Sequence, residues 1–227
     1  VLFRSRLTPD ARFLLLSSLA AREPDLSPYA ASKRAGEEVL KTRSGQGRGS
    51  WLAVRAPAVY GPGDRETLAY FKTVDRGLAP RPMVAGARLS LIHVADLAEA
   101  VVRALESDLA ASVYEVDDGH PGGHTYDDMA RAAGLALKGG GGRHPLAVSV
   151  PRPVLAAVGA VNGLRQSLGG PAQILTAGKV AEMFHPDWTI HDRRLAEATG
   201  FAAQHDLQGG FADTVLWYRQ RHWLRNR

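Results

Sequence analysis

The feature that most constrains the fold of this chain is a short apolar run at residues 13–16, which ends in Ser17 and Ser18. Continuous apolar runs of this length are typical of strands that are buried on both faces of a parallel sheet. Residues 51–55 repeat the pattern, and a turn-rich loop follows them at residues 60–64. The carboxyl ends of parallel strands share one edge of the sheet, where ligands bind in open α/β proteins. The sequence therefore predicts an α/β protein with polar side chains gathered at this edge.

The helix predicted after the first apolar run carries a tyrosine and a lysine one turn apart. Ser27 is a suitable N-cap, and Pro28 suits the first helical position, where no backbone N–H is needed. Tyr29 and Lys33 then share one face of the helix. A phenol is a poor base at neutral pH, and a neighbouring ammonium group favours its ionised form. Such a pair can move a proton at an alcohol or ketone, although the same spacing also occurs on ordinary solvated helix faces.

Strand and helix patterns divide the chain into two regions. Strands and helices alternate as far as residue 118, and the pattern beyond it is mostly helical. We expect residues 1–118, including the insertion after Asp64, to form the second half of a doubly wound parallel sheet. We expect residues 119–227 to form a smaller, mostly helical substrate lobe.

One of the predicted helices, at residues 94–107, has a recognisable start signal. Asp96 and Glu99 have the spacing of a capping box, in which each side chain satisfies a free backbone N–H of the first turn. His93 comes directly before this helix and is expected to be a packed residue at a strand end, not a metal ligand.

Five segments occur in a fixed order along the chain. They are "SS" at 17–18, "YAASK" at 29–33, "RAPAVYGPGD" at 55–64, "LIHVADLAEAVVRAL" at 91–105, and the terminal run at 192–219 that begins "DRRLAEATGF". Together they resemble the extended branch of the short-chain dehydrogenase/reductases, which comprises NAD(P)-dependent epimerases, dehydratases and reductases. The resemblance covers most of the chain and implies a Rossmann-like doubly wound sheet with NAD or NADP as cofactor.

The resemblance also implies a role for each matching residue. Tyr29 would give a proton to the substrate oxygen, or take one from it, during hydride transfer. Lys33 would favour the phenolate and bind the nicotinamide ribose hydroxyls. Ser18 would hydrogen-bond the same substrate oxygen, and Ser17 is the alternative if the register shifts by one residue. The backbone that would face the nicotinamide is that of Pro57, Ala58 and Val59.

Two departures from the family pattern bear on the substrate. The connection between Ser18 and Tyr29 is compact, whereas sugar-nucleotide epimerases usually carry a longer one. Arg88 is displaced by one residue from the position at which some of those enzymes bind substrate phosphate. A nucleotide sugar is therefore a weaker expectation than a small alcohol, ketone or sugar-type molecule.

The glycine fingerprint that holds the cofactor pyrophosphate in this family has no counterpart here. Such a fingerprint joins a strand to the amino end of a helix, and none of the glycine clusters has that context. These clusters lie at residues 45–49, 119–123, 139–142 and 159–163. We expect the chain to be the C-terminal portion of a longer enzyme. We also expect "VLFRS" at 1–5 to be translated adapter sequence, so that the coding sequence begins at about Arg6. On that basis the chain alone would be inactive, and a non-catalytic scaffold is the alternative.

Composition narrows the remaining functional classes. The formal charge is +5, but the arginines are scattered, so no nucleic-acid partner is expected despite the basic terminal stretch at residues 218–227. The chain has no cysteine, and its eight histidines are dispersed, so no metal site is predicted. The longest apolar segment, at residues 154–164, is too short to span a bilayer, and no membrane partner is expected. A cytoplasmic protein, with a possible homodimer, is the resulting expectation.

Overall fold

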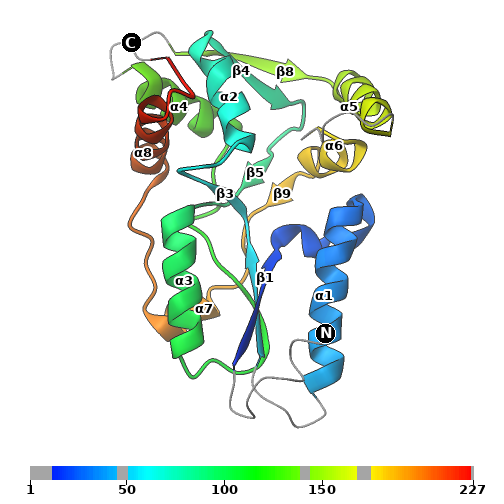
Figure 1. Ribbon diagram of the computed structural model, residues 1–227, viewed down its shortest axis with the longest axis vertical. Helices are drawn as coiled ribbons and strands as arrows, with labels where there is room; N and C mark the ends of the chain where they lie inside the picture. The colour runs from blue at the N-terminus through cyan, green and yellow to red at the C-terminus, as the bar shows by residue number, and fades with distance from the viewer. Residues whose placement is uncertain (1–11, 45–50, 139–143, 168–174, 226–227) are drawn as a thin grey trace.

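The computed structural model describes residues 12–44, 51–138, 144–167 and 175–225, so the predicted adapter at 1–5 lies outside the described residues. Its central sheet is parallel and has the strand order β1-β2-β7. These strands are β1 (Phe13–Ser18), β2 (Trp51–Ala56) and β7 (Ser112–Glu115). Figure 1 shows the sheet between α1 (Pro28–Ser44) and α3 (Val94–Glu106). Helices on both faces of a parallel sheet confirm the predicted doubly wound α/β class.

The connection from β1 to α1 consists of two short 3-10 turns, η2 (Leu19–Arg22) and η3 (Pro24–Leu26). The Ser18 hydroxyl accepts a hydrogen bond from the Ala20 backbone N–H at 3.2 Å, which caps η2. The Ser27 hydroxyl accepts one from the Ala30 N–H at 3.0 Å, so the predicted N-cap of α1 is confirmed. The carboxyl end of β1 and the amino end of α1 are therefore fixed by side-chain caps.

The predicted capping box of α3 is wrong. The helix begins at Val94, and its N-cap is His93, whose Nδ1 accepts a hydrogen bond from the Ala95 N–H at 3.4 Å. Asp96 does not form a capping box with Glu99, because its carboxylate accepts hydrogen bonds from the backbone N–H groups of Gln204 and His205 instead. The Asp96 side chain, which local spacing assigned to the start of the helix, makes a long-range contact instead.

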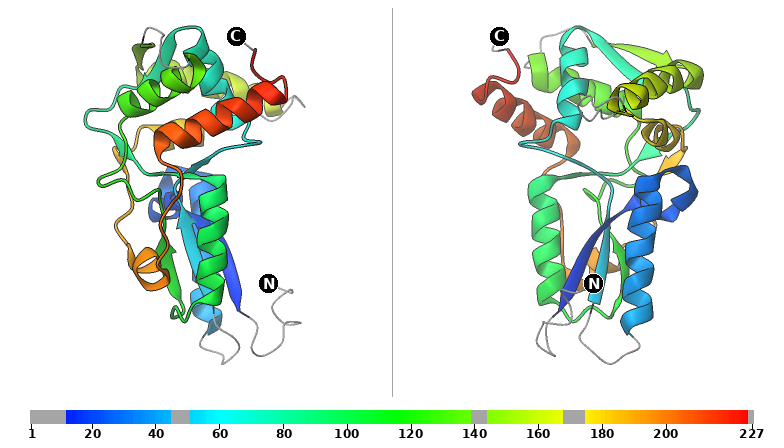
Figure 2. Two further views of the ribbon diagram at one scale, coloured as in Figure 1. Left: turned by 90° about the vertical axis from the view of Figure 1, so that its left-hand side faces the viewer. Right: turned by 45° about the vertical axis from the view of Figure 1, so that its right-hand side comes forward.

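A second group of elements lies beyond the carboxyl edge of the central sheet (Figures 1 and 2). Its helices are α2 (Glu66–Asp75), α4 (Tyr126–Lys138), α5 (Arg152–Ser167), α6 (Ala177–Met183) and α8 (Leu207–Gln220). Strands β4 (Leu78–Pro82) and β8 (Leu146–Val150) form a parallel pair within it. Strand β8 was not predicted, because the sequence pattern beyond residue 118 is mostly helical.

Short elements join the two groups. Strand β3 (Ala58–Tyr60) pairs with β6 (Leu91–His93), and β5 (Arg88–Leu89) pairs with β9 (Asp187–Trp188). Helix α7 (Arg194–Thr199) buries Leu195 in the core of the central sheet, although it follows residue 118 in the sequence. Helix α2, which precedes residue 118, contributes Phe71 and Val74 to the core of the second group. The predicted division at residue 118 stays a prediction.

Candidate active site

The predicted tyrosine and lysine lie in the first two turns of α1. Tyr29 is 50% exposed, and the Lys33 ammonium lies 5.6 Å from the centre of the Tyr29 ring. The Lys33 ammonium also donates a hydrogen bond to the backbone oxygen of Leu16 at 3.0 Å. This bond fixes the lysine against the carboxyl half of β1, so the pair stands near the end of that strand. Among the described residues, the Tyr29 hydroxyl has no hydrogen-bond partner and is free to meet a ligand.

The two serines at the end of β1 have different environments. Ser17 is buried, and its hydroxyl donates a hydrogen bond to Glu37 Oε1 at 2.6 Å. Ser18 is partly buried, and its oxygen accepts the Ala20 N–H while its own proton has no acceptor among the described residues. A hydroxyl that still has a proton to donate can bind a substrate oxygen. The geometry is compatible with Ser18 in the predicted role, whereas Ser17 is engaged with a carboxylate.

A buried ion pair that sequence reasoning missed connects α1 to the centre of the sheet. Glu37 is fully buried, and Arg55 on β2 donates to both of its oxygens, from Nε at 2.9 Å and from Nη2 at 2.7 Å. The bonds to Glu37 raise the pKa of Arg55. Glu37 comes four residues after Lys33, which itself comes four after Tyr29, so all three share one helix face. The spacing of Glu37 from Lys33, together with an arginine in an apolar strand, was the signal in the sequence that could have indicated this ion pair.

The ion pair continues across the sheet. Ser17, Arg55 and Glu115 are neighbours in the registers of β1, β2 and β7, and Arg55 Nη1 lies 3.7 Å from Glu115 Oε1. Glu115 also accepts a hydrogen bond from the His191 N–H at 2.8 Å. A buried charge is tolerated only when it is paired and hydrogen-bonded. The side chains of Ser17, Arg55 and Glu115, together with Glu37, therefore join β1, β2 and β7 to α1. This is the helix that carries Tyr29 and Lys33.

The residues predicted to face a nicotinamide lie where β2 leads into β3. Ala58 is exposed, whereas Pro57 and Val59 are partly buried. An ammonium group has three N–H donors, and the bond to Leu16 is the one hydrogen bond that Lys33 makes among the described residues. Free donors on Lys33 and the exposed position of Ala58 suit the ribose and ring of a nicotinamide. The residues present at this edge therefore fit the nicotinamide end of the predicted cofactor.

Comparison with known proteins shows which family this part of the chain resembles. Residues 13–116, which include β1, α1, β2 and β7, match the NAD dependent epimerase/dehydratase family. Through these residues, the chain is similar to the members of that family. The resemblance to the extended short-chain dehydrogenases is thereby confirmed.

One curated relative and two solved structures show how far the likeness extends. The ceramide reductase of Caulobacter vibrioides (strain NA1000 / CB15N) is 38% identical over 214 residues, which are 94% of this chain and 64% of that protein. The UDP-glucuronic acid 4-epimerase from Bacillus cereus, in complex with NAD, is 13% identical with a TM-score of 0.65. RMD from Pseudomonas aeruginosa, complexed with NADPH, is 16% identical with a TM-score of 0.62. The match covers 93% of this chain in both cases, with 62% of the epimerase and 68% of RMD. Both structures share the fold of this chain.

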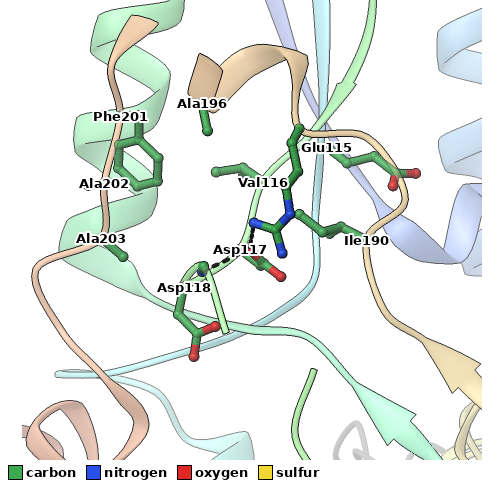
Figure 3. Close-up of a pocket in the computed structure, with 11 residues that line it drawn as sticks. Glu115, Val116, Asp117, Asp118, Ile190, Ala196, Phe201, Ala202 and Ala203 are labelled. Atoms are coloured by element: carbon green, nitrogen blue, oxygen red, sulfur yellow. Dashed lines mark hydrogen bonds and ion pairs between the residues drawn. The ribbon is translucent and has the colours of Figure 1, made fainter. Parts of the chain in front are cut away.

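A cavity of about 210 Å³ opens at the carboxyl end of β7 (Figure 3). Asp117 lies on its wall, accepts hydrogen bonds from the Ser90 hydroxyl at 2.7 Å and the Gly119 N–H at 2.8 Å, and faces Arg193 Nη1 at 3.6 Å. Burial raises the pKa of Asp117 despite these partners. The polar groups of this carboxylate are satisfied within the protein.

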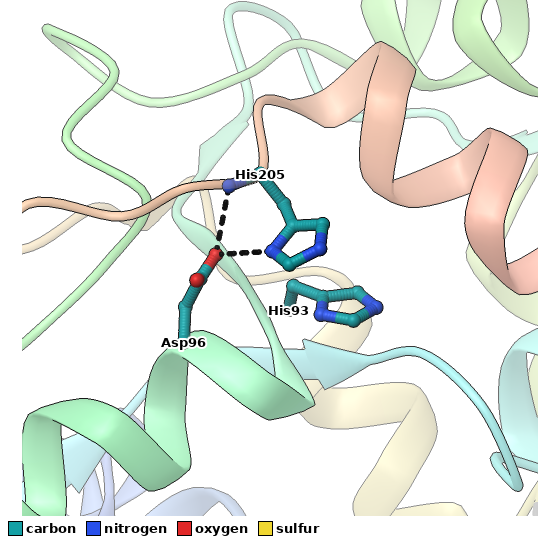
Figure 4. A group of neighbouring side chains, drawn as sticks. All are labelled: His93, Asp96 and His205. Carbon is teal, nitrogen blue, oxygen red and sulfur yellow. Dashed lines mark hydrogen bonds and ion pairs between the residues drawn. The ribbon is translucent and has the colours of Figure 1, made fainter.

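His93, Asp96 and His205 bring three potential metal-ligand atoms within 4.8 Å of one another (Figure 4). The two imidazole rings are stacked, with centroids 4.0 Å apart and planes inclined by 27°. An imidazole binds a metal in its ring plane at about 2 Å, so two nearly parallel stacked rings do not direct their lone pairs at one ion. Asp96 Oδ2 already accepts the His205 N–H and Nδ1–H, each at 3.0 Å. The cluster therefore joins the segment before α8 to α3.

Within the part of the chain that the structure describes, every helix falls short of the length and apolar character that crossing a bilayer requires.

Proposed function

We propose that this chain supplies the catalytic and substrate-binding part of an NAD(P)-dependent oxidoreductase that acts on an alcohol or a carbonyl group. The observation that carries the proposal is the placement of Tyr29 and Lys33. Lys33 is fixed to the end of β1 by its bond to Leu16, and α1 is fixed to β2 by the bidentate pair of Glu37 and Arg55. The two reactive side chains are thus held on a rigid helix at the ligand-binding edge of a parallel sheet.

Each residue has one task in the proposed reaction. Tyr29 donates its proton to the carbonyl oxygen during reduction, and accepts it back during oxidation of the alcohol. Lys33 directs its free N–H groups at the ribose hydroxyls. Ser18 donates a hydrogen bond to the same substrate oxygen. A bound NAD or NADP supplies or accepts the hydride. Pro57, Ala58 and Val59 form the backbone edge against the nicotinamide.

We propose an amphiphilic substrate of the ceramide class in preference to a nucleotide sugar. The relative with 38% identity is a ceramide reductase. Arg88, the residue closest in sequence to the family's phosphate-binding position, directs Nη1 to the backbone oxygens of Gly122 and Gly123, each at 3.3 Å. A cavity of about 420 Å³ lies beside it, and its wall combines apolar side chains, among them Pro82, Met83 and Tyr126, with the charged Arg81, Arg88 and Asp127. The apolar part of this wall suits an alkyl chain, and its charged part suits a polar headgroup.

The activity belongs to the complete protein, and the chain spans less than two thirds of the length of the ceramide reductase that it matches. We propose that residues 119–227, with the insertion after Asp64, provide the substrate lobe. The pyrophosphate of the cofactor needs a glycine-rich strand–turn–helix, which this sequence lacks. On its own the chain is therefore expected to bind the nicotinamide weakly and to be inactive.

The direct test is NAD(P)H fluorescence titration of this chain and of the complete product of its genomic locus. Lys33→Met in the complete product should weaken cofactor binding about tenfold or more, because it removes both the charge and the ribose donors. Lys41→Met is the matched control, since Lys41 lies on the same helix and pairs with Glu38 at 3.0 Å. Equal binding by the complete product and both variants would contradict the proposal. A complete product that binds no nicotinamide would favour the non-catalytic scaffold.

A further inference from the structure

We propose that α5 and the neighbouring β4–β8 pair form a surface that binds an anionic lipid bilayer. We call it the apolar end, and it consists of Leu78, Met83, Leu146, Val148, Val154, Val158 and Val161. Each of these apolar side chains is exposed, from 37% for Val148 to 66% for Leu146. The elements that carry them lie together at one extremity of the molecule, remote from the amino ends of β1 and β2 (Figures 1 and 2).

The strand pair contributes one part of the apolar end. Leu78 pairs with Leu146, and the residue opposite Val148 is Pro80. Side chains at alternate positions of a strand lie on one face of the sheet, so Leu146 and Val148 share a face. The backbone N–H of Met83 bonds to the Val150 oxygen at 3.1 Å, which places Met83 at the end of β8 where α5 begins.

Helix α5 contributes the second part. Val154, Val158 and Val161 lie at positions i, i+4 and i+7, which form one stripe of the helix. A different stripe holds α5 to its neighbours: Asn162 donates to the Leu175 oxygen at 3.1 Å, and a side chain at Gly159 would meet the Thr176 backbone at 3.2 Å. The valine stripe is thus left in solvent while the helix itself is anchored. An anchored helix with an exposed apolar stripe can lie against a lipid surface.

The charge of this region identifies the partner as an anionic surface. Residues 129–181 contain no aspartate or glutamate, whereas their basic residues are Arg131, Lys138, Arg143, Arg152, Arg165 and Lys179. Two of these are paired with acids outside the segment, Arg131 with Asp128 at 3.5 Å and Lys179 with Glu66 at 3.7 Å. Arg152 opens α5, is exposed, and makes no ion pair among the described residues. Asp127, an acid that borders the strand pair, is paired with Arg81 at 2.7 Å. Exposed apolar side chains beside cationic ones fit lipid headgroups and the first methylenes of their chains.

This surface changes one expectation from the sequence. The segment at residues 154–164 is too short to span a bilayer, and that length argument led to the expectation of no membrane partner. Length does not prevent a helix from lying in the plane of the interface, where the apolar stripe enters the lipid and the cations remain at the headgroups. The inference depends on exposure and charge alone, and so does not rest on the proposed enzymatic function.

The experiment is flotation of this chain with vesicles, without cofactor or substrate. Vesicles of 70% phosphatidylcholine and 30% phosphatidylglycerol should bind the chain in about 0.1 M salt, and pure phosphatidylcholine vesicles should bind it at least tenfold more weakly. Raising the salt to about 0.5 M should also weaken binding to the anionic vesicles, because exposed charges are then screened. Arg152→Gln should weaken binding to the anionic vesicles severalfold and leave the small binding to neutral ones unchanged.

The combined variant Val154→Ser, Val158→Ser and Val161→Ser should lower the partition coefficient at least tenfold. Its matched control replaces three other exposed apolar residues, Val39, Val102 and Leu216, with serine and should retain binding within about twofold. Circular dichroism should show that both variants are folded; if the triple-valine variant unfolds, Arg152→Gln and the salt series decide. Absence of binding, or equal binding by both variants, would overturn the proposal. Self-association through the valines in sedimentation, without binding to vesicles, would also overturn it by making this an interface between copies.

Discussion

Glu37 of α1 and Arg55 of β2 form a buried bidentate ion pair two turns beyond Tyr29 on the same helix face. Because Ser17 donates to the same carboxylate, this pair fixes both the rotation of α1 and the end of β1. The positions of Tyr29 and Lys33 therefore depend on this charge pair, although the pair touches neither substrate nor cofactor in the proposed reaction.

Removing one charge of this pair should be strongly destabilising. Glu37→Gln leaves the Arg55 guanidinium buried without its bidentate partner, and we expect a loss of about 3 kcal/mol in the free energy of unfolding. Urea denaturation followed by circular dichroism measures this loss. The double variant Glu37→Leu with Arg55→Met should recover most of it, because it removes both buried charges together. A stability of Glu37→Gln within about 0.5 kcal/mol of the parent chain would contradict the assigned role.

Substitution of the two serines of β1 should affect different properties, stability for Ser17 and turnover for Ser18. Ser17→Ala removes a hydrogen bond to a buried carboxylate and should cost about 2 kcal/mol of stability. Ser18→Ala removes the cap of η2 and should cost about 1 kcal/mol. In the complete gene product, however, Ser18→Ala should show the larger fall in turnover at saturating cofactor. The opposite ranking in turnover would assign the substrate contact to Ser17.

Packing between α8 and β3 predicts a sharp response at Gly210. A side chain there would collide with the Tyr60 hydroxyl and lie 2.8 Å from Tyr60 Cε2, and Tyr60 is itself buried. Gly210→Ala should destabilise the protein by about 1–3 kcal/mol in urea denaturation, despite the better helix propensity of alanine. In the control Gly36→Ala, the new carbon meets one Leu15 methyl at 3.3 Å, and a smaller change is expected. Equal effects of the two substitutions would show that Tyr60 can move aside.

The stacked histidines predict a dependence of stability on pH. Burial lowers the pKa of His93 in the folded protein, and the neighbouring His205 adds to this effect. The unfolded chain, in which a histidine has a pKa of about 6.5, then binds more protons than the folded protein. Stability should therefore fall as the pH drops below about 6.5.

The measurement is the free energy of unfolding between pH 7.5 and 5, compared with that of His93→Asn, which retains a capping oxygen for Ala95. The variant should lose part of the pH dependence. His222→Asn is the control, because His222 is exposed and its φ of 58° suits asparagine. A pH dependence that His93→Asn leaves unchanged would show that another group is responsible.

The sequence was sufficient for features that depend on local chemistry. The apolar run before Ser17 became β1, Ser27 became the N-cap of α1, and the spacing of Tyr29 and Lys33 placed both on one helix face. These signals act within a few residues, where helix and strand periodicity determine which side chains share a face.

Contacts between distant segments could not be predicted in this way. Asp96 had a local spacing that indicated a capping box, but its partners are 108 and 109 residues away. Glu37 and Arg55 were visible as single residues, and only the pairing of β1 with β2 shows that they meet. Strand β8 was missed because its ladder partner, β4, lies in the insertion that precedes residue 118.

The central claim is that Tyr29 transfers the proton at the substrate oxygen. Its most direct test is the turnover of Tyr29→Phe in the complete gene product, with NADPH or NADH and a ceramide-class carbonyl substrate. We predict that kcat falls at least 100-fold while the dissociation constant of the nicotinamide cofactor stays within about threefold, because the ring remains and only the proton is lost. A variant with kcat near that of the parent protein would contradict the claim.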